Sequence, residues 1–317
     1  MPELMNAYSA IVSAAEAASV KLIVDYKAAN RVHANFVKTD SLEDAIIGHA
    51  LIAKRSLALG SIVSVKRLAL MKIPSVLVSL NKTPVNHAIN LYPESVQELY
   101  DDILCSFKLS EDKKVLLPIV IHIDPLLKNT REQLEILSTK AVENFLETYS
   151  IDKLEKLLKS VLPDNLESLA LMQRSLENVQ KTIETISENW KKRTKRSFIA
   201  SEKYMTDGAD FIIITYGSIS TNAKSAVKTL RGLGEKVGLI RIHLFTPLPN
   251  LELSTTRKIA VLDTKFFLGA DGMLYRQIKD LNKNMISFIG ATVTSEDVLE
   301  LFQHLKTSEK LERVWMI

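Results

Sequence analysis

The pair Gly217–Ser218 combines residue types and a position that could bind an anion. It follows the apolar run FIIITY and precedes STNAKSAVKTL, which has the composition of a helix. In such a strand-to-helix turn, backbone N–H groups can approach an anion or a loop of a partner closely. The alternative interpretation is a tight turn in which Ser218 or Ser220 caps the helix. The glycines of GLGEKVG stand in the reverse order, after a helix and before a strand, which indicates helix capping.

The six histidines do not indicate a metal site, because none is paired at a spacing typical of metal ligands. His122 and His243 lie inside apolar runs, so we interpret them as core residues. No Ser, His and acid set, P-loop or pair of zinc-binding cysteines is recognisable. The residues alone therefore predict no self-contained active site and no metal bound by this chain.

Charge and cysteine content exclude several classes of protein. The formal net charge is only +4 over 317 residues, which does not indicate nucleic-acid binding. The basic run WKKRTKR is interpreted as a solvated helix end, with a nucleic-acid or membrane patch as the alternative. Cys105 is the only cysteine, so the chain alone can form neither an iron–sulfur cluster nor a disulfide. With no leader-like or membrane-spanning segment, we expect a cytoplasmic protein.

Two α/β domains joined by a helical connector are expected from the order of apolar runs. In the first domain, residues 1–130, the pattern predicts strands at KLIVDY, SIVSV, SVLVSLN and KVLLPIVIHID, with helices between them. Residues 131–203 read as long helices without a strand. Residues 204–317 alternate strand and helix again, with strands expected at ADFIIITYG, EKVGLIRIHLF, RKIAVLD and MISFIG. Such alternation predicts two parallel sheets covered on both faces.

The segment LYPESVQELYDDILCSFKLSEDKKVLLPIVIHID resembles the end of the pyrimidine-binding domain in alpha subunits of 2-oxoacid:ferredoxin oxidoreductases. The resemblance resumes at YMTDGADFIIITYGSISTNAKSAVKTLRGLGEKVGLIRIHLFTPLPNLEL and at IAVLDTKFFLGADGMLY, which are similar to the family's transketolase C-terminal type of domain. It implies a shortened thiamine pyrimidine-binding domain followed by a transketolase C-terminal-like domain. Such subunits include those of pyruvate synthase.

In this family, thiamine diphosphate lies between two subunits. A beta chain holds the diphosphate, Mg²⁺ and iron–sulfur clusters, while the alpha chain supplies a glutamate that hydrogen-bonds the aminopyrimidine. The resemblance therefore implies a beta partner, gamma and delta subunits as further partners, and ferredoxin reached through the complex. It implies that this chain alone holds no cofactor.

Three places in this chain correspond to site residues of the family. Glu43 lies within one residue of the activating glutamate, although a gap-free count gives Leu42, and the alternative is an ordinary first-turn helix acid. Tyr26 begins the stretch that replaces the family's YPITP turn, so its threonine corresponds to Ala29. Asn81 and Lys82 match an Asn–Arg pair whose arginine binds the substrate carboxylate, and a lysine lacks the arginine's planar fork.

The resemblance leads to one main hypothesis and two alternatives. The main one is the alpha-type subunit of an enzyme that converts a 2-oxoacid such as pyruvate to acyl-CoA and reduces ferredoxin, active only with a beta subunit. The first alternative is a non-catalytic paralogue with a structural or assembly role, consistent with the lost threonine and arginine. The second is a transketolase-like or dehydrogenase component with another electron acceptor. The segment EKVGLIRIHLF disfavours this alternative, because it resembles the ferredoxin-linked family most.

Overall fold

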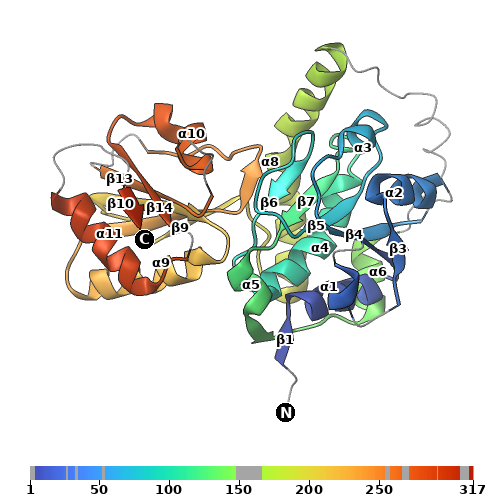
Figure 1. The fold of residues 1–317 in the computed structure, drawn as a ribbon, viewed down its shortest axis with the longest axis horizontal. Coiled ribbons are helices and arrows are strands. Elements are labelled where there is room, and N and C mark those ends of the chain that lie inside the picture. Colours follow the sequence, from blue (N-terminus) through green and yellow to red (C-terminus); the bar gives the residue numbers. More distant parts are fainter. Residues whose placement is uncertain are drawn as a thin grey trace. The chain divides into compact units, whose positions relative to one another are not determined.

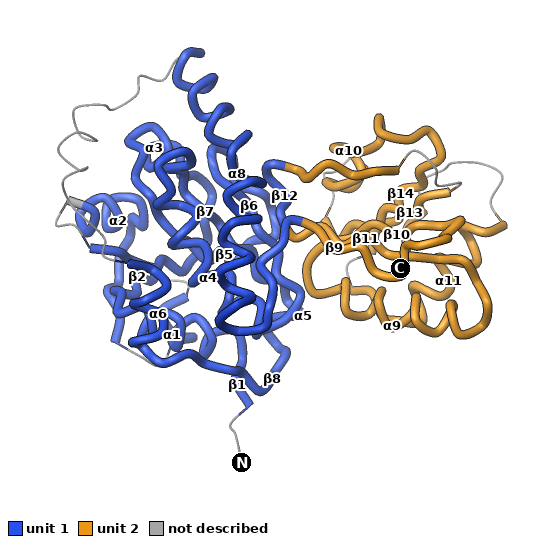
Figure 2. Tube along the Cα trace, turned by 180° about the vertical axis from the view of Figure 1, so that it is seen from behind, with its two compact units in different colours: residues 1–200, 244–247 blue, residues 201–243, 248–317 orange. Residues whose placement is uncertain are grey.

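The computed structural model describes residues 4–25, 28–32, 35–51, 54–147, 166–253, 258–265, 271–290, 292–307 and 314–316. The chain forms two compact units, shown in different colours in Figure 2. Unit 1 consists of residues 1–200 and 244–247, and unit 2 of residues 201–243 and 248–317. Each is built around one sheet, and each is described by itself.

The sheet of unit 1 has seven strands in the order β12-β6-β7-β5-β4-β2-β3. Every neighbouring pair is parallel except β12 with β6. The strands are β2 (Lys21–Asp25), β3 (Val37–Thr39), β4 (Ser56–Gly60), β5 (Val76–Ser79), β6 (Ile89–Leu91), β7 (Ile119–His122) and β12 (Leu244–Thr246). A separate two-stranded ribbon pairs β1 (Leu4–Asn6) with β8 (Arg131–Gln133).

Helices cover both faces of this sheet, as expected for buried parallel strands (Figure 1). The helices are α1 (Ala7–Ala17), α2 (Leu42–Leu51), α3 (Lys66–Leu70), α4 (Val96–Ser110), α5 (Pro125–Asn129), α6 (Thr139–Leu146) and α8 (Leu166–Thr194), with a 3-10 turn η1 (Ala29–Arg31). Apolar residues of α1, α4, α6 and α8 share one core, which includes Phe145 and Trp190. Those of α2 and α3 pack in another, on the opposite face of the strands.

Two expectations for this unit are wrong. The segment SIVSV was expected to be a strand but does not form one. The strand is β4, which begins five residues earlier, in a stretch whose Leu and Ala residues indicated a helix. Leu57 and Leu59 point into one core and Ala58 into the other, so tertiary burial overrides helix propensity. The helix expected from residue 131 begins only at Thr139, because residues 131–133 pair with β1 instead.

The sheet of unit 2 has the order β15-β14-β13-β10-β11-β9, and β9 alone is antiparallel to its neighbour. Its strands are β9 (Ser201–Tyr204), β10 (Phe211–Tyr216), β11 (Val237–Ile242), β13 (Lys258–Asp263), β14 (Met285–Gly290) and β15 (Val314–Met316). Its helices are α9 (Ile219–Gly232), α10 (Met273–Ile278) and α11 (Ser295–Thr307), with a 3-10 turn η3 (Lys279–Leu281). Helices α9 and α11 pack together against the sheet (Figure 1). The expected α/β class is thus confirmed for both units.

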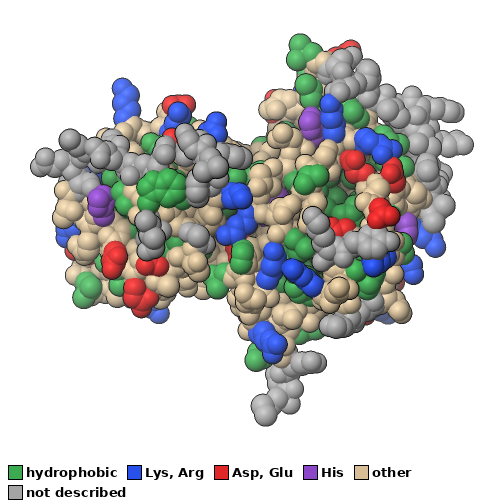
Figure 3. Space-filling view, in the orientation of Figure 1, with side chains coloured by type: hydrophobic (Ala, Val, Ile, Leu, Met, Phe, Trp, Pro, Cys, Tyr) green, Lys and Arg blue, Asp and Glu red, His purple; other side chains and the backbone are tan. Residues whose placement is uncertain are grey.

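No helix in the described part of the chain is long and apolar enough to cross a membrane. Acidic and basic side chains are interspersed over the face drawn in Figure 3.

Candidate functional site

The carboxyl ends of the parallel strands in unit 1 gather the polar residues that sequence singled out. Strands β2, β4, β5 and β7 run in register and in the same direction, so their last residues lie along one edge of the sheet. In open α/β sheets, ligands bind outside this edge. We therefore take the residues that follow these four strands, together with those that follow β3, which is parallel to β2, as the candidate site.

Glu43 lies in the first turn of α2, which follows β3. The start of α2 lies against the end of β4, because a Cβ added at Gly60 would be 2.9 Å from Cδ1 of Leu42. One carboxylate oxygen of Glu43, Oε1, is buried and has no hydrogen-bond partner among the described residues. A helix N-terminus favours a carboxylate, but a buried oxygen without a partner is costly unless a ligand supplies one.

Asp25 is the last residue of β2, and both of its carboxylate oxygens accept hydrogen bonds from main-chain N–H groups. Oδ1 accepts a hydrogen bond from the N–H of Ala28 at 2.8 Å, and Oδ2 accepts one from the N–H of Ser61 at 2.6 Å. The second bond joins the turn after β2 to the turn after β4. Gly60 makes room for it, because a Cβ at this position would be 2.3 Å from Oδ2. Sequence reasoning missed Asp25, since its partners lie up to 36 residues away.

Asn81 and Lys82 follow β5 and lie at the same edge. The N–H of Leu80 donates to the carbonyl of Gly60 at 2.9 Å, and the N–H of Asn81 donates to Oγ of Ser79 at 3.1 Å. The segment that carries Asn81 and Lys82 is thus joined to the ends of both β4 and β5. The structure brings this pair and Glu43 to one edge of the sheet, whereas Tyr26 lies outside the described residues.

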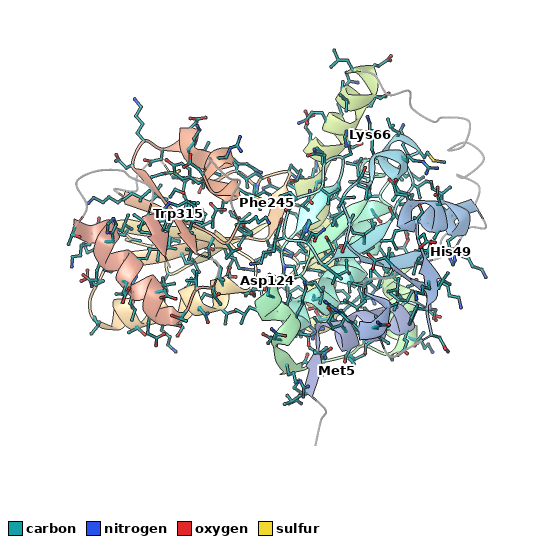
Figure 4. All side chains as sticks on the ribbon, viewed as in Figure 1. Met5, His49, Lys66, Asp124, Phe245 and Trp315 are labelled. Atoms are coloured by element: carbon teal, nitrogen blue, oxygen red, sulfur yellow. The ribbon has the colours of Figure 1, made fainter. Side chains whose placement is uncertain are left out.

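Lys128 adds a cation that sequence reasoning did not predict. It lies in α5, a helix capped by Asp124, which is labelled in Figure 4. Its ammonium Nζ donates to the carbonyl of Leu80 at 2.9 Å. Burial lowers the pKa of Lys128, and the positive charges of Arg31 and Lys82 lower it further, against the opposing effect of Asp124. The charges of Arg31 and Lys82 therefore both act on Lys128, beside the candidate site. A lone lysine in a short helix gives no signal of this in the sequence.

The strand-to-helix turn in unit 2 has the expected form. Gly217 adopts a left-handed backbone conformation, with φ of 70°, and Ser218 occupies the N-cap position of α9. The Ser218 side chain makes no capping hydrogen bond to the helix. The hydroxyl of Ser220, in the first turn, is buried and lacks a hydrogen-bond partner among the described residues. The side-chain cap that was the alternative interpretation is therefore not formed by Ser218.

Asp263 is a second carboxylate that sequence reasoning missed. It ends β13 and accepts hydrogen bonds from the N–H groups of Leu274 at 2.8 Å and Tyr275 at 3.0 Å, at the start of α10. Burial raises its pKa to about 7, against the lowering effect of these two donors. A Cβ at Gly272 would be 2.1 Å from Oδ2, so only glycine fits there. Asp263 thus joins β13 to α10.

No group of three or more His, Cys, Asp or Glu side chains in the described ranges is arranged to hold a metal ion. The thiol of Cys105 is buried in α4, and burial raises its pKa well above the ordinary value.

Comparison with known proteins gives one family match and several relatives. Residues 209–298, within unit 2, match the family described as pyruvate:ferredoxin oxidoreductase core domain II. Over 240 residues, which are 70% of this chain and 63% of the relative, the chain is 27% identical to the pyruvate synthase subunit PorA of Methanothermobacter thermautotrophicus. It is 29% identical to the ketoisovalerate oxidoreductase subunit VorA of Pyrococcus abyssi, over 71% of this chain and 63% of VorA.

The chain is related to the alpha subunits of 2-oxoacid:ferredoxin oxidoreductases. A further relative, the alpha subunit of NADH-dependent phenylglyoxylate dehydrogenase from Aromatoleum evansii, is 32% identical over 64% of this chain and 55% of its own length. The chain thus spans less than two thirds of the length of these curated relatives.

The fold agrees with this relationship. The solved structure of 2-oxoglutarate:ferredoxin oxidoreductase from Magnetococcus marinus, with 2-oxoglutarate, coenzyme A and succinyl-CoA bound, superposes with a TM-score of 0.68. The alignment covers 95% of this chain and 65% of that one at 14% identity, so it supports the fold alone. The expected resemblance to this family and the expected two-domain α/β fold are confirmed.

Proposed function

We propose that this chain is the alpha-type subunit of a thiamine-dependent 2-oxoacid:ferredoxin oxidoreductase. The complex would oxidatively decarboxylate a 2-oxoacid such as pyruvate, form an acyl-CoA and reduce ferredoxin. It would need a beta subunit that holds the diphosphate, Mg²⁺ and iron–sulfur clusters, with gamma and delta subunits as further partners, and it would work in the cytoplasm. The relatives named above support this proposal, and its strongest structural support is a single side-chain atom.

That atom is Oε1 of Glu43, a buried carboxylate oxygen without a hydrogen-bond partner among the described residues. It fits a ring nitrogen of the aminopyrimidine of thiamine diphosphate, which would supply the hydrogen bond that the atom lacks. When bound, the cofactor supplies the carbanion chemistry needed to break the bond to a 2-oxoacid's carboxylate. Glu43 would orient the aminopyrimidine and hold the proton shared with its ring nitrogen.

The cations at the same edge of the sheet as Glu43 would bind the substrate. The Lys82 ammonium, at the edge that also bears Glu43, would pair with the carboxylate of the 2-oxoacid, and Lys128 would add a second positive charge. The buried ends of β4 and β5 would exclude water from that pair, which strengthens the attraction.

A non-catalytic structural subunit is the second candidate function. Ala29, which the family resemblance aligns with a substrate-contacting threonine, is buried and has only a methyl group, so it cannot hydrogen-bond a substrate. Lys82 also lacks the two-pronged geometry of an arginine. Both departures would suit a subunit that kept the fold and lost the chemistry.

Purification of the native complex separates these two functions. The tagged chain should copurify with a chain that contains iron, identified by mass spectrometry and an iron assay. The complex should reduce a viologen dye when a 2-oxoacid, coenzyme A and thiamine diphosphate are supplied. An assembled complex that reduces no dye with any 2-oxoacid would support the structural subunit, and a chain that elutes alone would contradict both.

A further inference from the structure

Three consecutive main-chain carbonyls at the candidate site are each bonded to a side chain from a different element. Lys128 of α5 donates to the carbonyl of Leu80 at 2.9 Å. His122 of β7 places Nδ1 2.6 Å from the carbonyl of Asn81, and Tyr92, just after β6, donates its hydroxyl to the carbonyl of Lys82 at 2.5 Å. The backbone that carries Asn81 and Lys82 is therefore held from three directions.

The two rings in this arrangement support each other. Tyr92 and His122 are stacked, with ring centroids 4.6 Å apart and planes 13° from parallel. Both are buried, and Phe245 of β12, labelled in Figure 4, lies 5.3 Å from the Tyr92 ring. Close packing leaves such rings few alternative rotamers, so the hydrogen bonds that they form are fixed in direction.

Asn90 extends the same network to the loop after Lys82. Its Oδ1 lies 2.8 Å from Nε2 of His122 and accepts a hydrogen bond from the N–H of Val85 at 2.8 Å. Its Nδ2 donates to the carbonyls of Val85 and Ala88. The main-chain contacts with Val85 and Ala88 determine which end of the Asn90 amide is oxygen, and they hold the loop that follows Lys82.

A fixed backbone matters here because lysine is a flexible cation. Its ammonium is a point charge on a four-carbon chain, without the planar fork by which arginine orients a carboxylate. The direction from which Lys82 meets a carboxylate therefore depends on where its main chain is held. Displacement of a binding group by about 1 Å can reduce a rate by roughly 10²-fold.

We propose that Tyr92 and His122 are positioning residues of the 2-oxoacid site, which hold the Asn81–Lys82 main chain so that the Lys82 ammonium meets the substrate carboxylate in one geometry. This inference rests on the proposed function. Neither residue would touch the substrate, since the Tyr92 hydroxyl and Nδ1 of His122 are bonded to main-chain carbonyls and Nε2 of His122 faces Oδ1 of Asn90.

Tyr92→Phe in the native complex tests the proposal, because it keeps the stacked ring and removes only the hydroxyl. Tyr100→Phe is the matched control: Tyr100 is equally buried in unit 1, and its hydroxyl accepts a hydrogen bond from the N–H of Leu137 at 3.0 Å, away from this segment. The loss of one such bond should raise the KM for the 2-oxoacid about 3- to 10-fold in the Tyr92 variant. The kcat and the KM for coenzyme A should stay within about twofold. Hydrogen exchange of the amides of residues 79–86 should become faster.

The substitution of His122 gives a second, independent measurement. His122→Gln keeps an N–H that can reach the carbonyl of Asn81, so its KM should lie closer to the wild-type value than that of His122→Leu. Tyr92→Phe with an unchanged KM, or Tyr100→Phe with the same increase, would overturn the proposal while the proposed function stands. A wild-type complex that turns over no 2-oxoacid would instead overturn the proposed function, and this inference with it.

Discussion

The carboxylate of Asp25 occupies the space that a side chain at Gly60 would need. A Cβ at Gly60 would lie 2.3 Å from Oδ2 of Asp25, the oxygen that accepts a hydrogen bond from the N–H of Ser61. This contact joins the turns after β2 and β4, which border the start of α2 and hence Glu43. The candidate site therefore depends on a glycine that makes no contact with a ligand.

Gly60→Ala should destabilise unit 1 by about 1–3 kcal/mol, because the added methyl group must push the Asp25 carboxylate off the N–H of Ser61. Gly48→Ala is the matched control, since a Cβ at Gly48, within α2, meets nothing within 4 Å. In a helix, Gly→Ala should raise the free energy of unfolding by up to about 1 kcal/mol. In a Trp315→Phe background, where Trp190 is the only tryptophan and is fully buried in unit 1, fluorescence reports unfolding in urea. Equal effects of the two substitutions would contradict this account of Gly60.

Gly272→Ala should destabilise unit 2 in the same way, by about 1–3 kcal/mol, because its Cβ would overlap the Asp263 carboxylate. The contact between β13 and the start of α10 should loosen, which hydrogen exchange of the Leu274 and Tyr275 amides would detect. Gly232→Ala, at the end of α9, should leave their exchange unchanged, as nothing lies within 4 Å of its Cβ. Unchanged exchange in Gly272→Ala would show that α10 does not need this contact.

His122 should make unit 1 less stable in acid. Burial lowers the pKa of His122 from its ordinary 6.5 to about 4, against the effect of the Asn81 carbonyl, which raises it. The unfolded chain therefore binds the proton more readily, and stability that is fully present above pH 6.5 is lost as the pH falls toward 4. The full effect is roughly 3 kcal/mol.

The comparison of wild type with His122→Gln isolates this contribution from other titrating groups. Between pH 7 and pH 4.5, the free energy of unfolding, followed by Trp190 fluorescence, should fall more steeply in the wild type than in the variant. Parallel curves would mean that His122 is protonated in the folded protein, where each ring nitrogen would then donate to the oxygen that it faces.

The sequence predicted the class of fold because buried parallel strands are long apolar runs. The expected strands at FIIITY, RKIAVLD and MISFIG coincide with β10, β13 and β14. Short edge strands such as β9, with the polar sequence SEKY, gave no such signal. EKVGLIRIHLF was expected to be one strand, but it supplies β11 to one sheet and β12 to the other. Periodicity cannot reveal that division, since both parts are buried.

The candidate site was predictable only where a local pattern or the family resemblance marked it. Glu43 follows a helix-start signal, and Asn81–Lys82 follow an apolar strand. Asp25 and Lys128 have partners 36 and 48 residues away, so their roles depend on tertiary contacts that no local pattern records. The role of Glu43 stays a prediction.

The turnover of the native complex that carries Glu43→Gln tests the central claim most directly. Glutamine keeps the shape of the side chain but cannot exchange a proton with the aminopyrimidine, so viologen reduction by a 2-oxoacid should fall by about 10²- to 10⁴-fold. Asp44→Asn is the control, because Asp44 is an exposed acid in the same helical turn, paired with Arg67 at 2.6 Å. That control should keep turnover within about twofold, and both complexes should assemble normally. If the Glu43 variant assembles and turns over like the wild type, Glu43 is an ordinary helix acid and the chain does not supply the catalytic glutamate.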